Sequence, residues 1–244
     1  MRTERGSTVR SRVNGEVVQG LEPAVWCPPT ETAQRFLASA YDSVAAVFEN
    51  LETVRQVRRD QGRNIQGRLP GNEEDLLRAA ILFTGAGMDA TLKRLIKDAL
   101  PALLDVSPDV HGKFEEFLRT RLGADAVAAT LARYLLSPVP RDAIILDYIG
   151  SLTGESLQSV EQVDKVAGAL GLNDAALRRE IRNLRPLFVA RNEISHELDL
   201  LHTQKQGDRH RRTRRIGATE TLVHSSLNLT QKMVNGVASA LGEC

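Results

Sequence analysis

The chain has 244 residues, of which 42% are hydrophobic, 26% charged and 4% aromatic, a composition typical of a globular protein. Its 32 basic and 31 acidic residues nearly cancel, so the total charge favours no class of partner, and two cysteines are too few for a disulfide framework or a cysteine-based zinc site. No apolar run approaches the roughly 18 residues of a spanning helix, and the charged start lacks the apolar run of a secretory signal. We therefore expect a cytoplasmic protein with no membrane partner.

The amino-terminal residues 1–29 mix arginine, glycine, serine and valine without periodicity, which predicts a flexible arm. From Thr30 onward, apolar residues recur at steps of three and four, the spacing of an amphipathic helix. No segment alternates with a period of two. The sequence therefore predicts that residues 30–241 form one all-α domain, a multi-helix bundle.

The second helical pattern begins after Asn72, read as its N-cap, and stops just before Pro101. Gly85 and Gly87 lie inside it, where each glycine costs about 1 kcal/mol relative to alanine. A phosphate-binding loop is excluded because no strand precedes the pair and the spacing does not fit. Close contact with neighbouring helices is the better explanation.

Helical patterns continue to the end of the chain. The shorter ones lie at about 110–120, 124–136, 140–150 and 156–169, and another begins after Asn173. Pro186 falls inside the next pattern and should kink or restart the helix. We expect a helix over about 187–202, an arginine-rich loop over 203–217 and a last helix over 218–241.

Basic residues gather in this last third of the chain. Between Arg178 and Arg215 there are eleven basic and five acidic residues. The densest part contains Arg209, Arg211, Arg212, Arg214 and Arg215. Like charges this close repel one another unless water or an anionic partner surrounds them, and RNA phosphates would supply such a partner. We predict that these arginines bind RNA; a solvated surface loop is the alternative.

The helix before this loop carries Arg191, Asn192 and His196. Asn192 and His196 are four residues apart and share a polar face, whereas Arg191 lies about 140° from His196 around the helix axis. An apolar stripe is expected at Ile194, Leu198 and Leu201. Arg191 must therefore curl its side chain to meet His196, or meet the histidine of a second copy.

These three residue types suit RNA cleavage without a metal or other cofactor. A histidine can take the proton from a ribose 2′-OH, and an arginine can neutralise the phosphate that the 2′-oxygen attacks. Asn192 can hold His196 or the phosphate in register. The product would carry a 2′,3′-cyclic phosphate.

The pattern resembles the motif of HEPN superfamily ribonucleases, in which a polar residue follows an arginine and a histidine lies four to six residues beyond that arginine. Arg191, Asn192 and His196 match it, and the small residue Ala190 and a last helix after a polar loop extend the likeness. The chain looks most similar to the RiboL-PSP-HEPN type. Residues 173–241 align and 73–99 do so loosely, so the other helices are additions to a HEPN-type bundle.

The resemblance implies a metal-independent endoribonuclease that cleaves single-stranded or loop RNA as a toxin or anti-phage defence effector. It also implies a homodimer, and an antitoxin or defence complex as a further partner. A non-catalytic all-α HEPN adaptor that binds RNA or a protein is the alternative, as is a purely structural role for Asn192 and His196 at a helix interface. His196 and His202 are six residues apart, which excludes the four-residue spacing of a zinc metalloprotease.

Overall fold

A computed structural model describes residues 12–13, 16–17, 20–63, 69–123, 127–204 and 209–242. The described part is dominated by helices, which confirms the all-α fold class; its only strands form a hairpin with two residues in each strand. The elements are β1 (Arg12–Val13), β2 (Glu16–Val17), the 3-10 turn η1 (Pro28–Thr30), α1 (Glu31–Asp60), α2 (Gly71–Val106), α3 (Pro108–Leu122), α4 (Val127–Leu135), α5 (Pro140–Thr153), α6 (Val160–Ala169), α7 (Ala175–Arg182), α8 (Arg185–Glu197) and α9 (Ile216–Ala240). None of these helices is long and apolar enough to cross a membrane.

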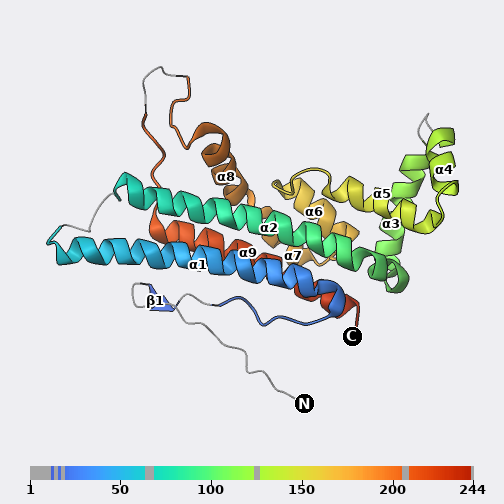
Figure 1. Cartoon of the computed structure of the whole chain (residues 1–244), viewed down its shortest axis with the longest axis horizontal. Coiled ribbons are helices and arrows are strands. Elements are labelled where there is room, and N and C mark those ends of the chain that lie inside the picture. Colours follow the sequence, from blue (N-terminus) through green and yellow to red (C-terminus); the bar gives the residue numbers. More distant parts are fainter. Residues whose placement is uncertain are drawn as a thin grey trace, which may run out of the picture.

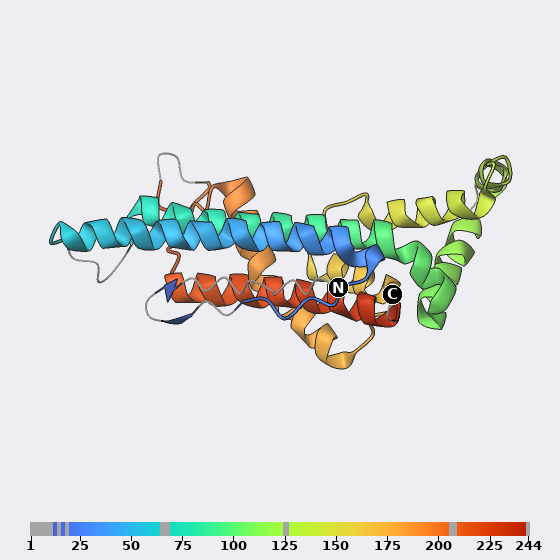
Figure 2. The ribbon, with the colours of Figure 1, turned by 60° about the horizontal axis from the view of Figure 1, so that its bottom comes forward.

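Three long helices form the body of the molecule. α1 and α2 run antiparallel, and α9 packs along both of them (Figures 1 and 2). α8 lies against α2 near the amino-terminal end of α2, whereas α3, α4 and α5 extend the molecule beyond its other end (Figure 1). The helix with the candidate motif is thus supported by the central helix of the fold.

α2 contributes to two clusters of buried side chains. The larger cluster joins α2 to α5, α6, α8 and α9, with Leu92 and Leu95 fully buried. The smaller cluster lies between α1, the first turns of α2 and α9, and includes Leu37 and Leu77. Burying one such leucine contributes about 1.5–3 kcal/mol, so α2 is held from several sides.

The two glycines of α2 lie where other helices come close. A Cβ atom added to Gly87 would lie 2.3 Å from the Cβ atom of Ala40 in α1. One added to Gly85 would lie 3.3 Å from the Cγ atom of Arg191 in α8. The prediction of close helix contact is confirmed, and the two glycines serve different neighbours.

The ends of α2 differ from the predicted ones. The helix begins at Gly71 after Pro70, so Asn72 lies inside it and is not its N-cap. At the other end α2 continues through Pro101 to Val106, although a proline inside a helix removes one backbone hydrogen bond. The side chains of Leu100 and Leu103 are fully buried, and their burial offsets that loss.

α8 begins as predicted and ends earlier. Pro186 lies in its first turn, which confirms a restart of the helix there. The predicted extension to residue 202 is wrong, because the helix ends at Glu197 and Leu198 and Asp199 take left-handed conformations with φ of 51° and 62°. Leu198 and Leu201 are therefore exposed, at 68% and 49%, and do not belong to an apolar stripe.

The last residues of the predicted arm are attached to α9. The backbone N–H of Val25 donates to the side chain of Asn235 over 2.9 Å, and Asn235 donates to the carbonyl of Pro23 over 3.0 Å. Trp26 is exposed, whereas Cys27 is buried and disulfide-bonded. Most of the arm predicted over 1–29 lies outside the described residues, so its flexibility stays a prediction.

Candidate functional site

The arrangement of α8 separates an apolar face from a polar one. Leu187, Ala190 and Ile194 are buried against the core, while Asn192 and His196 are exposed. The predicted polar face of Asn192 and His196 is confirmed, whereas Ile194 is the one member of the predicted apolar stripe that is buried. The two polar members of the motif are open to a ligand from solvent.

Arg191 lies between these two faces. Its side chain is half-buried where Gly85 leaves room for it, and its Nη1 donates to Asn192 Oδ1 over 3.1 Å. Among the residues that the structure describes, Arg191 has no carboxylate partner. Asn192 therefore orients the guanidinium group of Arg191, rather than the imidazole of His196.

His196 lies at the carboxyl-terminal end of α8, one residue before the helix stops. Within the described ranges its side chain makes no hydrogen bond or ion pair. No group of three or more histidine, cysteine, aspartate and glutamate side chains in those ranges is placed to hold a metal ion. The imidazole can meet a substrate without breaking an existing contact.

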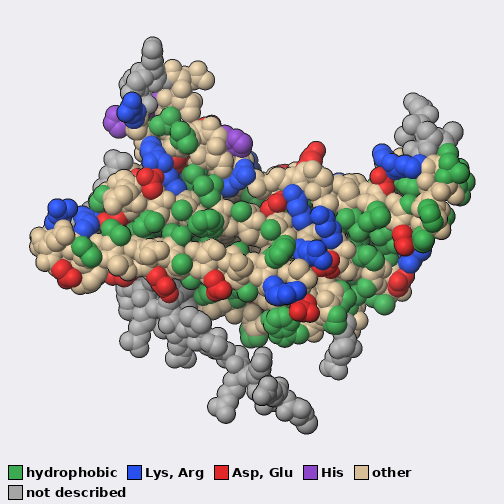
Figure 3. Space-filling view, viewed as in Figure 1, with side chains coloured by type: hydrophobic (Ala, Val, Ile, Leu, Met, Phe, Trp, Pro, Cys, Tyr) green, Lys and Arg blue, Asp and Glu red, His purple; other side chains and the backbone are tan. Residues whose placement is uncertain are grey.

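Three of the five loop arginines are paired with acidic side chains of α2 and α8. Arg211 Nη1 lies 2.6 Å from Asp75 Oδ1, Arg212 Nε lies 3.1 Å from Glu193 Oε1, and Arg214 Nη2 lies 3.0 Å from Glu193 Oε2. Basic and acidic side chains accordingly lie next to each other around this end of the molecule (Figure 3). These pairs fix the loop to α8, which carries the motif, and to α2, on which α8 packs.

The centre of this network is buried. Asp199 is fully buried and Arg78 of α2 is 3% exposed, and Arg78 Nε lies 2.7 Å from Asp199 Oδ2. Arg78 also donates to the backbone carbonyl of Arg212 over 2.8 Å, and Arg214 binds Asp199 from the loop side. One carboxylate thus joins α2, the end of α8 and the loop before α9.

Charge pairing decides the protonation of Asp199. Burial raises the pKa of this carboxyl group, but the hydrogen bonds and positive charges of Arg214 and Arg78 outweigh burial, so the pKa of Asp199 is lowered. Burial likewise lowers the pKa of Arg214, and its bonds to Asp199 and Glu193 reverse this, so the pKa of Arg214 is raised. The cluster is therefore ionised at neutral pH.

The other two loop arginines differ from their neighbours. Arg209 and Arg215 are exposed, and neither makes an ion pair with any described residue. Residues 205–208 of the predicted loop lie outside the described ranges. The loop therefore combines an anchored part, which reaches α2 and α8, with two arginines whose charge faces solvent.

Arg78 and Asp199 were not expected from the sequence. The signal for Arg78 is an arginine between Leu77 and Ile81, inside the apolar spacing of its helix, where a charged side chain needs a buried partner. No comparable signal marks Asp199, because the sequence predicts that the helix continues through it.

No protein-family model, curated protein or solved structure matches this chain. The function of the site is therefore inferred from its side chains, their contacts and their burial.

Proposed function

We propose that the protein is a metal-independent endoribonuclease of HEPN type, with Arg191, Asn192 and His196 as its catalytic residues. The observation that carries the proposal is the distribution of charge around α8. Arg78, Arg211, Arg212 and Arg214 are neutralised by carboxylates, whereas Arg191 and His196 have no carboxylate partner among the described residues. A phosphate is a fitting ligand for such a guanidinium group, and an exposed imidazole can take up a proton.

The chemistry follows from these side chains. The imidazole of His196 takes the proton of a ribose 2′-OH, and the 2′-oxygen attacks the adjacent phosphorus. Arg191, held by Asn192, binds the phosphate oxygens on which charge accumulates. The bond from phosphorus to the 5′-oxygen breaks, and this oxygen takes up a proton, which leaves a 2′,3′-cyclic phosphate and a 5′-OH end.

The test is cleavage of single-stranded RNA by the purified full chain in EDTA, with analysis of the ends formed. We expect His196→Ala and Arg191→Ala to abolish cleavage while the melting temperature stays within a few degrees, because His196 is exposed and Arg191 is half-buried. His111→Ala and Arg185→Ala are the matched controls, since both residues are exposed and outside the motif. Wild-type rates in both motif variants would refute the site.

A non-catalytic adaptor is the second candidate, and one observation favours it. Leu198 and Leu201 expose 68% and 49% of their surface next to the arginine-rich loop, a combination typical of a protein-docking surface. In that case the purified chain would bind RNA or a protein partner and leave RNA intact. The cleavage assay separates the two candidates.

The role in the cell is also a proposal. The likeness to HEPN ribonucleases supports a toxin or anti-phage defence effector that acts on cytoplasmic RNA, alone or with an antitoxin or a larger defence complex. Growth arrest on expression, relieved by His196→Ala, is the expected sign of such a role.

A further inference from the structure

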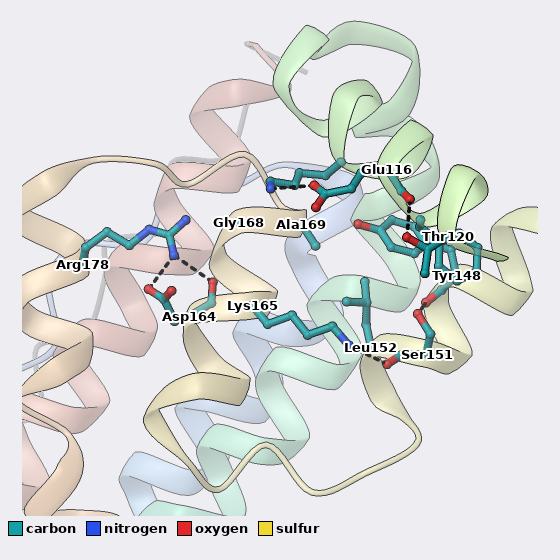
Figure 4. A pocket seen from close by; sticks show the side chains of 12 residues that line it. Glu116, Thr120, Tyr148, Ser151, Leu152, Asp164, Lys165, Gly168, Ala169 and Arg178 are labelled. Carbon is teal, nitrogen blue, oxygen red and sulfur yellow. Dashed lines mark hydrogen bonds and ion pairs between the residues drawn. The ribbon is translucent and has the colours of Figure 1, made fainter. Parts of the chain in front are cut away.

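A pocket of about 400 Å³ lies between α3, α5, α6 and α7 (Figure 4), and no residue of α8 lines it. Its size falls within the range of small-molecule sites. Most of its lining belongs to helices outside the part of the chain that resembles HEPN proteins. Its existence therefore does not depend on the proposed ribonuclease function.

One wall of the pocket is aromatic and apolar. The rings of Phe117 and Tyr148 are tilted against each other with centroids 4.8 Å apart, and Leu152 and Ala169 continue this wall. Such a surface accepts a flat or apolar group of a ligand.

The hydroxyl group of Tyr148 lies in this wall without a hydrogen-bond partner. The residue is only 5% exposed, and its side chain points from α5 into the pocket toward α6 (Figure 4). Among the described residues nothing donates to or accepts from its oxygen, which is not fully buried and is therefore open to a ligand in the pocket. Burial and the charge of Glu116 raise the pKa of Tyr148 to about 12, so at neutral pH the group is a donor.

The charged residues of the lining are unequally paired. Lys113 Nζ lies 2.9 Å from Glu116 Oε2, and Arg178 Nη1 lies 2.5 Å from Asp164 Oδ1. Lys165 has no carboxylate partner in the described part of the chain; its amino group donates only to the backbone carbonyl of Ser151, over 3.3 Å (Figure 4). The lining has three basic and two acidic side chains, so one positive charge has no acidic partner, and that charge is on Lys165.

We propose that this pocket binds a small organic anion with an aromatic body. The body packs on Phe117 and Tyr148, the carboxylate or phosphate binds the amino group of Lys165, and a polar atom of the ligand accepts from the Tyr148 hydroxyl. α7, which contributes Arg178 to the lining, is joined to α8 by only two residues.

The experiment is a calorimetric titration of the full-length chain with 1-naphthyl phosphate and 1-naphthoate. Neutral 1-naphthol and inorganic phosphate are the comparison ligands, since each lacks one half of the proposed chemistry. Lys165→Gln and Tyr148→Phe remove the charge and the hydroxyl. Lys97→Gln and Tyr41→Phe are matched controls on exposed and half-buried positions outside the pocket.

We expect at least one naphthyl anion to bind more tightly than both comparison ligands. Lys165→Gln should weaken this binding about tenfold and Tyr148→Phe about threefold, while the two control variants bind like the wild type. Tighter binding of the phosphate or of the carboxylate would identify the anionic group. The proposal is overturned if neither anion binds, if 1-naphthol binds as tightly as the anions, or if both pocket variants bind like the wild type. Because the titration measures ligand binding and not RNA cleavage, its outcome does not depend on the proposed ribonuclease function.

Discussion

Asp199 combines full burial, a left-handed backbone conformation and two arginine partners. Aspartate and asparagine tolerate this conformation better than most residues, so Asp199→Asn removes the charge and keeps the backbone. Arg78 would lose this contact but keep its buried partner Glu74, whose Oε2 lies 3.1 Å from Arg78 Nη2. We expect the free energy of unfolding to fall by about 2–3 kcal/mol in a denaturant titration, the cost of lost hydrogen bonds to a charged group.

Asp75→Asn is the matched control, because Asp75 also binds Arg78 but its side chain is 53% exposed. Its loss should cost about 1 kcal/mol or less. Equal effects of the two substitutions would mean that burial does not set the strength of this network.

The contribution of Asp199 should also depend on pH. Its pKa in the folded chain is lowered relative to an unfolded carboxyl group, for which the value is about 3.9. The stabilisation is therefore fully present above that value and is lost as the pH falls through the folded-state pKa. The difference in stability between the wild type and Asp199→Asn should be constant near neutrality and shrink in acid.

At the scale of elements, the two glycines of α2 make room for different neighbours. Gly87 lies against α1, and Gly85 lies against Arg191 of α8. Gly87→Ala places a methyl group 2.3 Å from the Cβ atom of Ala40, so α1 must move. Overpacking of this kind outweighs the gain in helix propensity, and we expect a loss of about 1–2 kcal/mol in thermal unfolding.

Gly85→Ala should act differently, because its methyl group meets the Cγ atom of Arg191 at 3.3 Å. A shift of a few tenths of an ångström relieves this contact, so stability should change by less than about 1 kcal/mol. The guanidinium group moves with the side chain, and we expect RNA cleavage to fall about tenfold. Unchanged cleavage in Gly85→Ala would argue against a catalytic Arg191.

The loop before α9 makes a second prediction at this scale. Arg209 and Arg215 are exposed, so the double substitution to glutamine should weaken RNA binding and flatten its salt dependence, by about 0.7 in the log–log slope per lost contact. The double substitution of Arg211 and Arg212 should instead lower the melting temperature, because their ion pairs with α2 and α8 and their hydrogen bonds to the backbone after α8 are lost. An unchanged slope in the first variant would show that the loop does not contact RNA phosphates.

The end of α8 marks the limit of prediction from sequence. Pro186 signals the start of this helix because its ring fits the first turn. Leu198 carries no stop signal, since leucine seldom adopts the left-handed conformation that usually calls for glycine. The loop arginines were visible as charge, but their partners Asp75 and Arg78 lie more than 100 residues earlier in the chain. Pairing at such separations follows from the tertiary fold.

At the scale of the whole molecule, we expect the active unit to be a two-fold homodimer. Arg191 and His196 lie about 140° apart around one helix, so two copies packed about an isologous axis would bring both pairs to one cleft. Mixing inactive Arg191→Ala and inactive His196→Ala chains should then restore part of the cleavage, provided the subunits exchange. This follows because one composite site of each mixed dimer is intact.

Sedimentation velocity provides the control on assembly. A monomer that cleaves RNA would exclude the dimer. A dimer whose mixed form stays inactive would mean that each site uses the arginine and histidine of one chain, or that all four groups are needed.

The all-α class and the order of helices were predictable because apolar spacing is a local property of the chain. The block from α3 to α7 was predicted only as a series of short helices. Its pocket depends on Phe117, Tyr148 and Lys165, which come from three separate helices, and no spacing in the sequence brings them together.

The dependence of the motif helix on later residues has a consequence for synthesis on the ribosome. Domains fold as the chain emerges, from the amino terminus onward. α8 emerges before Arg214 and before α9, which supplies Val223, Leu227 and Val234 to the two cores. Until Arg214 and α9 have emerged, Asp199 lacks its ion pair with Arg214, and both clusters of buried side chains lack the residues that α9 contributes. A nascent chain without α9 therefore cannot complete the surroundings of Arg191 and His196, and we expect the proposed activity only after α9 has emerged.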